Sequence, residues 1–136
     1  MTTLTPYLLF DGKCEQAMEF YKSRFGGEPA ATKVEDSPAK DFMLASPHEK
    51  IVKARLNGKL EISVSDWLRP AQTPIRGNTV CLDRSGGTLE ELKTLFKRLS
   101  GGAEVTDSLK EQLFGTCGAL NDKFGVRWMF QTDKKP

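Results

Sequence analysis

The predicted secondary-structure elements follow one order twice along the chain of 136 residues. In each half, a short strand is followed by an amphipathic helix that ends at a pair of glycines, and then by a strand and a hairpin. The first repeat covers about residues 1–66 and the second about residues 78–133, and the linker 67–77 contains two prolines. We therefore predict an α+β fold, a single domain over residues 1–136 built from two βαβββ modules.

Each predicted module is a cupped antiparallel sheet with one helix on its back. Neither module buries enough apolar surface to be stable alone, so two modules have to pair. They pair either within one chain or with a second chain, and the sequence leaves both arrangements open.

The strongest strand signal lies near the end of the chain, at residues 113–131. Asn121-Asp122 before Gly125 is typical of a turn. After it, apolar and polar residues alternate with the period of a half-buried strand. Trp128 falls on the apolar face of this strand, so we expect it in the core.

Each predicted helix has a residue pattern that marks one of its ends. The first, Cys14–Phe25, ends at Gly26-Gly27, because glycine readily adopts the conformation that closes a helix. The second follows Thr88, which forms a capping box with Glu91 three residues later. Strands are predicted at residues 5–10, 28–34, 51–56, 59–66, 79–82 and 103–106, with some extended structure at 41–45.

Two of these strands flank Asn57-Gly58, a pair that predicts a two-residue hairpin turn. One face of the two strands is apolar and is expected to pack on a helix. The other face is either an ordinary solvent-exposed sheet surface or one side of a ligand pocket, and on the residues alone we favour the first. This polar face gathers Lys53, Arg55, Glu61, Ser63 and Ser65.

Composition argues against several classes of function. A net charge of +2 without a basic run does not indicate nucleic-acid binding. No apolar run is long enough for a membrane span and no signal-peptide pattern begins the chain, so we expect a cytoplasmic protein. The three cysteines form no Cys-x-x-Cys pair and are expected to be reduced. The one histidine, His48, lies in a predicted loop, which argues against a His-rich metal site or a Ser-His-Asp triad.

Three segments resemble the PhnB-like branch of the glyoxalase/bleomycin-resistance (vicinal oxygen chelate) superfamily. They are TPYLLFDGKCEQAMEFYKSRFGG at 5–27, GKLEISVSD at 58–66 and NDKFGVRWM at 121–129. The resemblance implies the paired βαβββ fold of that superfamily. It also implies a homodimer and a concave pocket inside each cupped sheet.

In the metal-dependent members of the superfamily, His or Glu side chains hold a divalent cation from four inward-facing strand positions. By motif, these positions fall here on Tyr7, Glu61, Gly77 (or its neighbour Asn78) and Met129. Glu61 alone is an ordinary ligand for such a cation. We therefore predict no metal site.

Two further departures concern other positions of the family pattern. Lys53-Ala54 replaces a His-Ala pair that is common on the third strand, and Phe114 replaces a tryptophan that is common in the seventh. The pocket implied by the resemblance then carries apolar walls and a few charges, which suits a small aromatic or amphipathic anion. Its expected lining residues are Tyr7, Lys53, Arg55, Glu61, Ser63, Phe114 and Met129.

We predict a small-molecule binding protein that needs no cofactor. The alternative is a metal-dependent lyase, isomerase or dioxygenase of the vicinal oxygen chelate type, so whether any reaction is catalysed stays open. Some relatives carry names that imply a ubiquinone methyltransferase. We do not predict that activity, because the glycine pairs are expected to end helices and no glycine-rich strand-to-helix turn is predicted to cradle a nucleotide-like cofactor.

Overall fold

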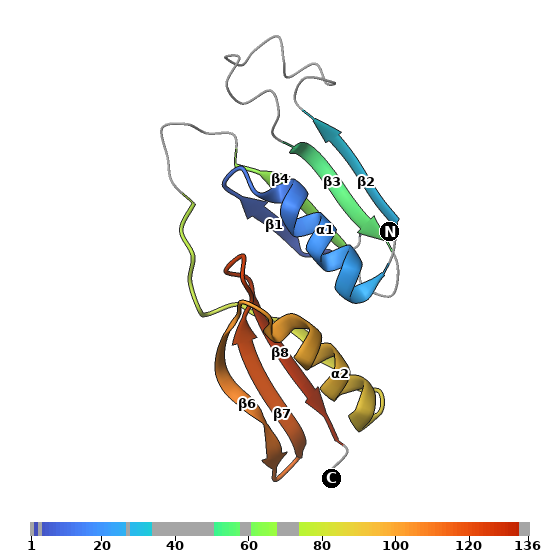
Figure 1. Ribbon diagram of the computed structural model, residues 1–136, viewed down its shortest axis with the longest axis vertical. Helices are drawn as coiled ribbons and strands as arrows, with labels where there is room; N and C mark the ends of the chain where they lie inside the picture. The colour runs from blue at the N-terminus through green and yellow to red at the C-terminus, as the bar shows by residue number, and fades with distance from the viewer. Residues whose placement is uncertain are drawn as a thin grey trace. The chain divides into compact units, whose positions relative to one another are not determined.

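A computed structural model describes residues 2, 4–26, 28–33, 51–57, 61–67 and 74–133. The chain forms two compact units, Met1–Ile75 and Arg76–Pro136, and their boundary lies within the segment 67–77. Within the described residues, each unit holds one helix and one four-stranded sheet (Figure 1). That the two units share one domain stays a prediction.

The two units have the same order of elements. The first contains β1 (Tyr7–Phe10), α1 (Cys14–Phe25), β2 (Glu28–Lys33), β3 (Ile51–Asn57) and β4 (Ile62–Asp66). The second contains β5 (Leu82–Ser85), α2 (Leu89–Ser100), β6 (Glu104–Gln112), β7 (Gly115–Asn121) and β8 (Arg127–Thr132). The strand order is β1-β4-β3-β2 in the first sheet and β5-β8-β7-β6 in the second. The α+β class and the repeated order of elements are as predicted.

Both sheets are mixed, whereas the prediction was antiparallel sheets. β1 pairs parallel with β4, and β5 pairs parallel with β8, while the other pairs are antiparallel. The helix between the first and second strands returns the chain to its starting end, so the second strand runs in the direction of the first. Two further reversals leave the fourth strand in that same direction, beside the first.

The register of β3 and β4 differs from the predicted two-residue turn. Such a turn at Asn57-Gly58 would pair Leu56 with Lys59, but Leu56 pairs with Ile62. In the predicted register Ile62 would face Lys53, which would mix apolar and charged positions on both faces. The observed register keeps the apolar positions of both strands on one face, because a register shift of one residue turns every side chain over.

The alternation of apolar and polar residues along the strands also determines which face of each sheet its helix covers. In the first unit, Phe10, Ile62 and Val64 are buried, as are Cys14 and Ala17 of α1, which packs against β2, β3 and β4. The second unit buries Leu92 and Leu99 of α2 with a matching set from the sheet, namely Leu120, Trp128 and Phe130. Trp128 is fully buried, as predicted.

Two strands of the second unit differ from their predicted ranges. The predicted strand 79–82 is β5, which begins at Leu82 and ends at Ser85, and the predicted strand 103–106 extends to Gln112 as β6. Residues 83–85 and 107–112 are mostly polar and show no clear alternation, so only their pairing with β8 and β7 identifies them as strands. The predicted extension at 41–45 and the loop around His48 lie outside the described residues.

A carboxylate from the sheet caps the first helix. The Cys14 amide donates a hydrogen bond of 2.9 Å to Asp66 Oδ1, while Lys13, at the N-cap position, makes no side-chain capping bond. Asp66 therefore satisfies a helix-end amide and places negative charge at the positive end of the helix dipole. The second helix is capped locally and as predicted, because Thr88 Oγ1 accepts from the Glu91 amide at 3.1 Å.

The turn between β7 and β8 is organised by Asp122, which is only 4% exposed. Its Oδ1 accepts from the amides of Phe124 (2.8 Å) and Val126 (3.1 Å). Its Oδ2 accepts from Trp128 Nε1 at 2.9 Å. One buried carboxylate thus fixes both the turn and the tryptophan that forms the core beneath it.

None of the helices in the described part of the chain is long and apolar enough to cross a membrane.

We predict that Asp122 and Trp128 are energetically coupled. Asp122→Asn places an amide donor opposite the Trp128 donor, and it should lower the free energy of unfolding by about 2 kcal/mol. In a Trp128→Phe background, where that donor is absent, the same change should cost at least ~1 kcal/mol less. Urea unfolding of the four proteins, followed by circular dichroism, measures the coupling. Equal costs in both backgrounds would show that the hydrogen bond contributes nothing.

Cys14 should make the protein less stable in alkali. Burial, then Asp66 and Glu15, raise the pKa of its thiol from 9.0 to about 12. Above pH 9.0 the unfolded thiol ionises while the buried thiol stays protonated, so this contribution to stability is complete below that pH and is lost as the pH rises toward 12. The expected slope is roughly 1 kcal/mol per pH unit. Urea unfolding between about pH 8 and about pH 11 should show a smaller slope for Cys14→Ala, and identical slopes would contradict the assignment.

Candidate functional site

Each sheet has one face that a helix covers and one that its own helix leaves free (Figure 1). In the first unit, β1 and β4 place Tyr7 and Ser63 at positions of opposite parity to the buried Phe10, Ile62 and Val64. Side chains of opposite parity in a strand point to opposite faces. We call these two surfaces the helix-free faces, and they carry the candidate site residues.

Three of the predicted site residues form one row across the first sheet. Tyr7 is the Cα partner of Ser63 on β4, and Ser63 is the partner of Arg55 on β3. Neighbouring strands lie about 4.8 Å apart, so the row brings together residues that are distant in sequence. Tyr7 is 52% exposed and Ser63 is half-buried.

Two more predicted residues belong to the same unit but lie outside this row. Lys53 is on β3, two residues before Arg55, and pairs with Thr32 on β2. Glu61 precedes β4 and is exposed.

The remaining two predicted residues belong to the second unit. Met129 is half-buried on β8, where it pairs with Ala119 on β7 and with Asp83 on β5. Phe114 lies in the turn between β6 and β7 and is 64% exposed. The strand register therefore does not place Phe114 in the row that contains Met129.

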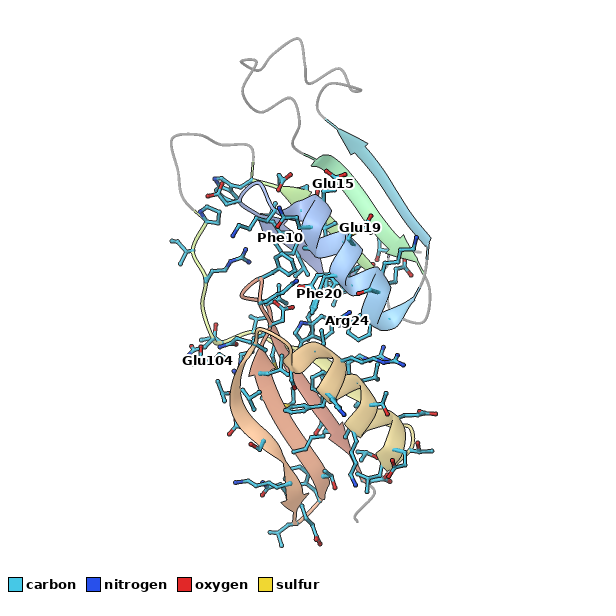
Figure 2. The ribbon with its side chains drawn as sticks, viewed as in Figure 1. Phe10, Glu15, Glu19, Phe20, Arg24 and Glu104 are labelled. Carbon is cyan, nitrogen blue, oxygen red and sulfur yellow. The ribbon has the colours of Figure 1, made fainter. Side chains whose placement is uncertain are left out.

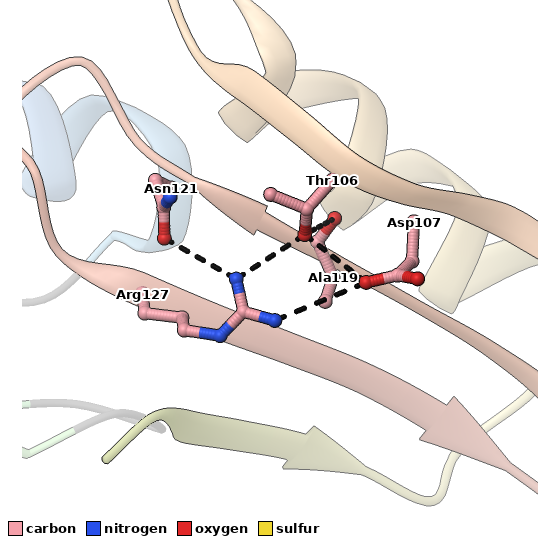
Figure 3. A network of polar contacts seen from close by, with 5 residues as sticks. All are labelled: Thr106, Asp107, Ala119, Asn121 and Arg127. Carbon is pink, nitrogen blue, oxygen red and sulfur yellow. Dashed lines mark hydrogen bonds and ion pairs between the residues drawn. The ribbon is translucent and has the colours of Figure 1, made fainter. Parts of the chain in front are cut away.

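A polar network on the second sheet was not predicted from the sequence (Figure 3). Arg127 Nη1 donates to Thr106 Oγ1 at 3.2 Å and to Asn121 Oδ1 at 3.4 Å. Its Nη2 lies 3.8 Å from Asp107 Oδ2. The alternation of β8 indicated that Arg127, like Met129, occupies the polar face. Of its partners on β6, Thr106 is the last residue of the predicted strand 103–106 and Asp107 lies beyond it, so the sequence pattern did not bring both to this face.

Acidic groups flank the rest of this face. Gln131 Nε2 donates to Asp83 Oδ2 at 2.6 Å. Burial, then Asp107 and Asp83, raise the pKa of the Cys117 thiol above its ordinary value. The thiol is therefore protonated at neutral pH and is a poor nucleophile.

The residues at the family's metal positions do not fit a divalent cation. Glu61 supplies one carboxylate, Tyr7 a phenol and Met129 a thioether, and only the first suits a hard or borderline cation. Gly77 and its neighbour Asn78 precede β5 and are exposed, and Gly77 offers no side-chain ligand. In the described ranges, no group of three His, Cys, Asp or Glu side chains is arranged to hold a metal ion.

One glycine pair lies in the predicted Ser-Gly-Gly turn after a strand and does not end a helix. Gly86 and Gly87 join β5 to α2, with φ angles of 83° and 72°. This is a glycine-containing strand-to-helix turn, so the argument that none exists was wrong. The turn still disfavours a phosphate, because a β-carbon at Gly87 would lie 2.6 Å from Glu91 Oε2. Glu90 adds a second negative charge in the first helical turn.

The exposed side of α1 carries charged side chains and gives no sign of a site. Figure 2 shows Glu15 and Glu19 one turn apart on this helix, and Phe20 and Arg24 likewise. The Arg24 guanidinium lies 4.7 Å from the centroid of the Phe20 ring, a cation–π contact.

Comparison with known proteins identifies relatives that extend over the whole chain. Protein YjdN of Escherichia coli (strain K12) is 28% identical over 97% of this chain and 96% of its own length. The crystal structure of protein PA1353 from Pseudomonas aeruginosa is 28% identical with a TM-score of 0.85, and the match covers 100% of both chains.

More distant structures share the fold. A structure from Bacillus cereus, described as a putative 3-demethylubiquinone-9 3-methyltransferase and PhnB protein, has 23% identity and a TM-score of 0.75 over 96% of this chain and 99% of the other. A glyoxylase/bleomycin resistance protein/dioxygenase domain from Frankia sp. EAN1pec has 16% identity and a TM-score of 0.65, over 97% and 92% of the two chains.

The family comparison agrees with these structures and with the motifs read from the sequence. Residues 2–131 match the family described as 3-demethylubiquinone-9 3-methyltransferase. The chain therefore belongs to this 3-demethylubiquinone-9 3-methyltransferase family, and its fold is that of the PhnB and glyoxalase/bleomycin-resistance structures.

Proposed function

We propose that the protein binds a small aromatic or amphipathic anion on the helix-free faces of its sheets, without a catalytic metal. The observation that carries the proposal is the row formed by Tyr7, Ser63 and Arg55. An aromatic ring, a hydroxyl and a guanidinium group at neighbouring positions provide stacking, hydrogen bonding and a positive charge. These are the elements with which proteins bind small organic anions.

The donor set supports binding over metal-dependent catalysis. A divalent site that polarises a substrate needs several protein ligands to fix its geometry, and one carboxylate holds a hydrated cation only loosely. Glu61 is the one carboxylate at the four family positions. A metal-dependent lyase, isomerase or dioxygenase is therefore the second candidate, and a measured metal would favour it.

The name of the matching family suggests methyl transfer as another candidate activity. A nucleotide-like methyl donor needs a turn whose amides approach it closely. The glycine turn before α2 is the nearest equivalent among the described residues, but the Glu91 carboxylate lies against Gly87 there. This argues against methyl transfer at that turn.

We also propose that the protein is a cytoplasmic homodimer whose βαβββ modules pair. Each sheet ends in edge strands, and β6 at the edge of the second sheet is almost entirely exposed along its length. Open sheet edges and half-covered sheets favour association with another module.

The anion proposal predicts which charges matter. Wild-type protein should bind 8-anilino-1-naphthalenesulfonate saturably, and Lys53→Ala/Arg55→Ala should weaken that binding about tenfold by removing the nearby positive charges. The control Lys97→Ala changes an exposed lysine on α2 and should leave the affinity unchanged. Fluorescence titration measures all three. If the double variant binds as tightly as wild type, the first sheet does not supply the counter-charge.

Native mass spectrometry tests the metal and dimer proposals together. Protein purified without chelators or an affinity metal column should have the mass of two chains and no stoichiometric metal. A metal that is present in wild type and lost in Glu61→Gln would replace the binding proposal by the enzyme proposal. A single-chain mass that persists at micromolar concentration would contradict the dimer.

A further inference from the structure

The guanidinium group of Arg127 is held in place from one side. Both hydrogen bonds of this side chain come from Nη1, one to Thr106 on β6 and one to Asn121 on β7 (Figure 3). Thr106 is itself fixed, because its Oγ1 also contacts the Ala119 carbonyl oxygen at 3.3 Å and Asp107 Oδ2 at 3.1 Å. The plane of the guanidinium is therefore oriented before any ligand arrives.

The other edge of the guanidinium keeps its donors available. Nε and Nη2 make no hydrogen bond to the part of the chain that the structure describes. The contact from Nη2 to Asp107 Oδ2, at 3.8 Å, is longer than a hydrogen bond. Every fully buried side-chain nitrogen or oxygen of the described residues has a hydrogen-bond partner. Because Nε and Nη2 have none, they are not fully buried, and solvent reaches this edge of the guanidinium.

The charge on Arg127 is only partly compensated. Its side chain is 19% exposed, whereas that of Asp107 is 60% exposed. An ion pair with one well-solvated partner contributes little, so an incoming anion displaces Asp107 at small cost. A fixed guanidinium edge with two parallel donors matches the two oxygens of a carboxylate or sulfonate.

One half-buried apolar side chain, that of Met129, lies next to this edge. Met129 follows Arg127 on the same face of β8, about 6.8 Å along the strand, and pairs with Ala119 on β7. The acidic residue of β5 beside Met129 is Asp83, and its carboxylate accepts a hydrogen bond from the Gln131 side-chain amide. A flat ring laid over the half-buried Met129 therefore places an acidic substituent beside Arg127.

We propose that Arg127 anchors the acidic group of a small aromatic carboxylate or sulfonate, whose ring lies over Met129. This inference rests on the proposed function and deepens it. It adds a second binding position, on the helix-free face of the second unit and separate from the row on the first sheet, and it gives the recognising group at that position.

The test uses two probes that share one ring system. 8-Anilino-1-naphthalenesulfonate is the sulfonate of N-phenyl-1-naphthylamine, which is neutral. Arg127→Gln should lower the affinity for the sulfonate about tenfold and leave the affinity for the neutral amine unchanged. Arg127→Lys keeps the charge but loses the two parallel donors, so it should give an intermediate loss. Arg98→Gln on α2 is the matched control and should change neither affinity.

A second variant separates an anion site from a purely structural arginine. Asp107→Asn removes the carboxylate that competes with the ligand, so it should tighten sulfonate binding about two- to threefold. If Arg127 only joined β6, β7 and β8, this change would leave sulfonate binding unchanged or weaken it.

Each outcome bears on a different claim. Equal sulfonate affinity in wild type and Arg127→Gln overturns the anchor, while the proposed function stands if Lys53→Ala/Arg55→Ala still loses affinity. Loss of both probes in Arg127→Gln, with thermal unfolding unchanged, overturns the anchor as well, because the effect then does not depend on the sulfonate. Failure of wild type to bind either probe overturns the proposed function and the anchor together.

Discussion

The alternation of apolar and polar residues along the strands is the constraint on which the rest of this structure depends. In strands such as β4 and β8 it assigns one face to a helix, and the register of the sheets has to preserve that assignment. The pairing of Leu56 with Ile62, rather than with Lys59, shows the constraint overriding the local turn preference of Asn57-Gly58. The same constraint leaves one face of each sheet without its own helix, and polar residues are grouped there.

Two buried carboxylates join elements that alternation alone does not connect. Asp66, at the end of β4, caps α1 from 52 residues away, and Asp122 holds the turn before β8 together with Trp128. Each satisfies backbone or indole donors that burial would otherwise leave without a partner. The start of α1 and the turn before β8 are therefore held by side chains from the sheets that carry the helix-free faces.

Local signals predicted a large part of the fold, and long-range pairing explains the rest. Both helices, the Thr88 cap and the last hairpin follow from features within a few residues of one another. The parallel edge strands and the extension of β6 depend on partners far along the chain, so no local pattern reveals them. For the same reason the row of Tyr7, Ser63 and Arg55 was partly foreseen from alternation, whereas the partners of Arg127 on β6 were not.

The central claim is that a small organic anion binds a helix-free sheet face directly, and a crystal structure of the complex with 8-anilino-1-naphthalenesulfonate tests it most directly. The account predicts the naphthalene ring against such a face, with the sulfonate about 2.9 Å from a guanidinium nitrogen. A probe bound between a helix and its sheet would contradict the account. So would a sulfonate held by a metal ion rather than by the protein's own cations.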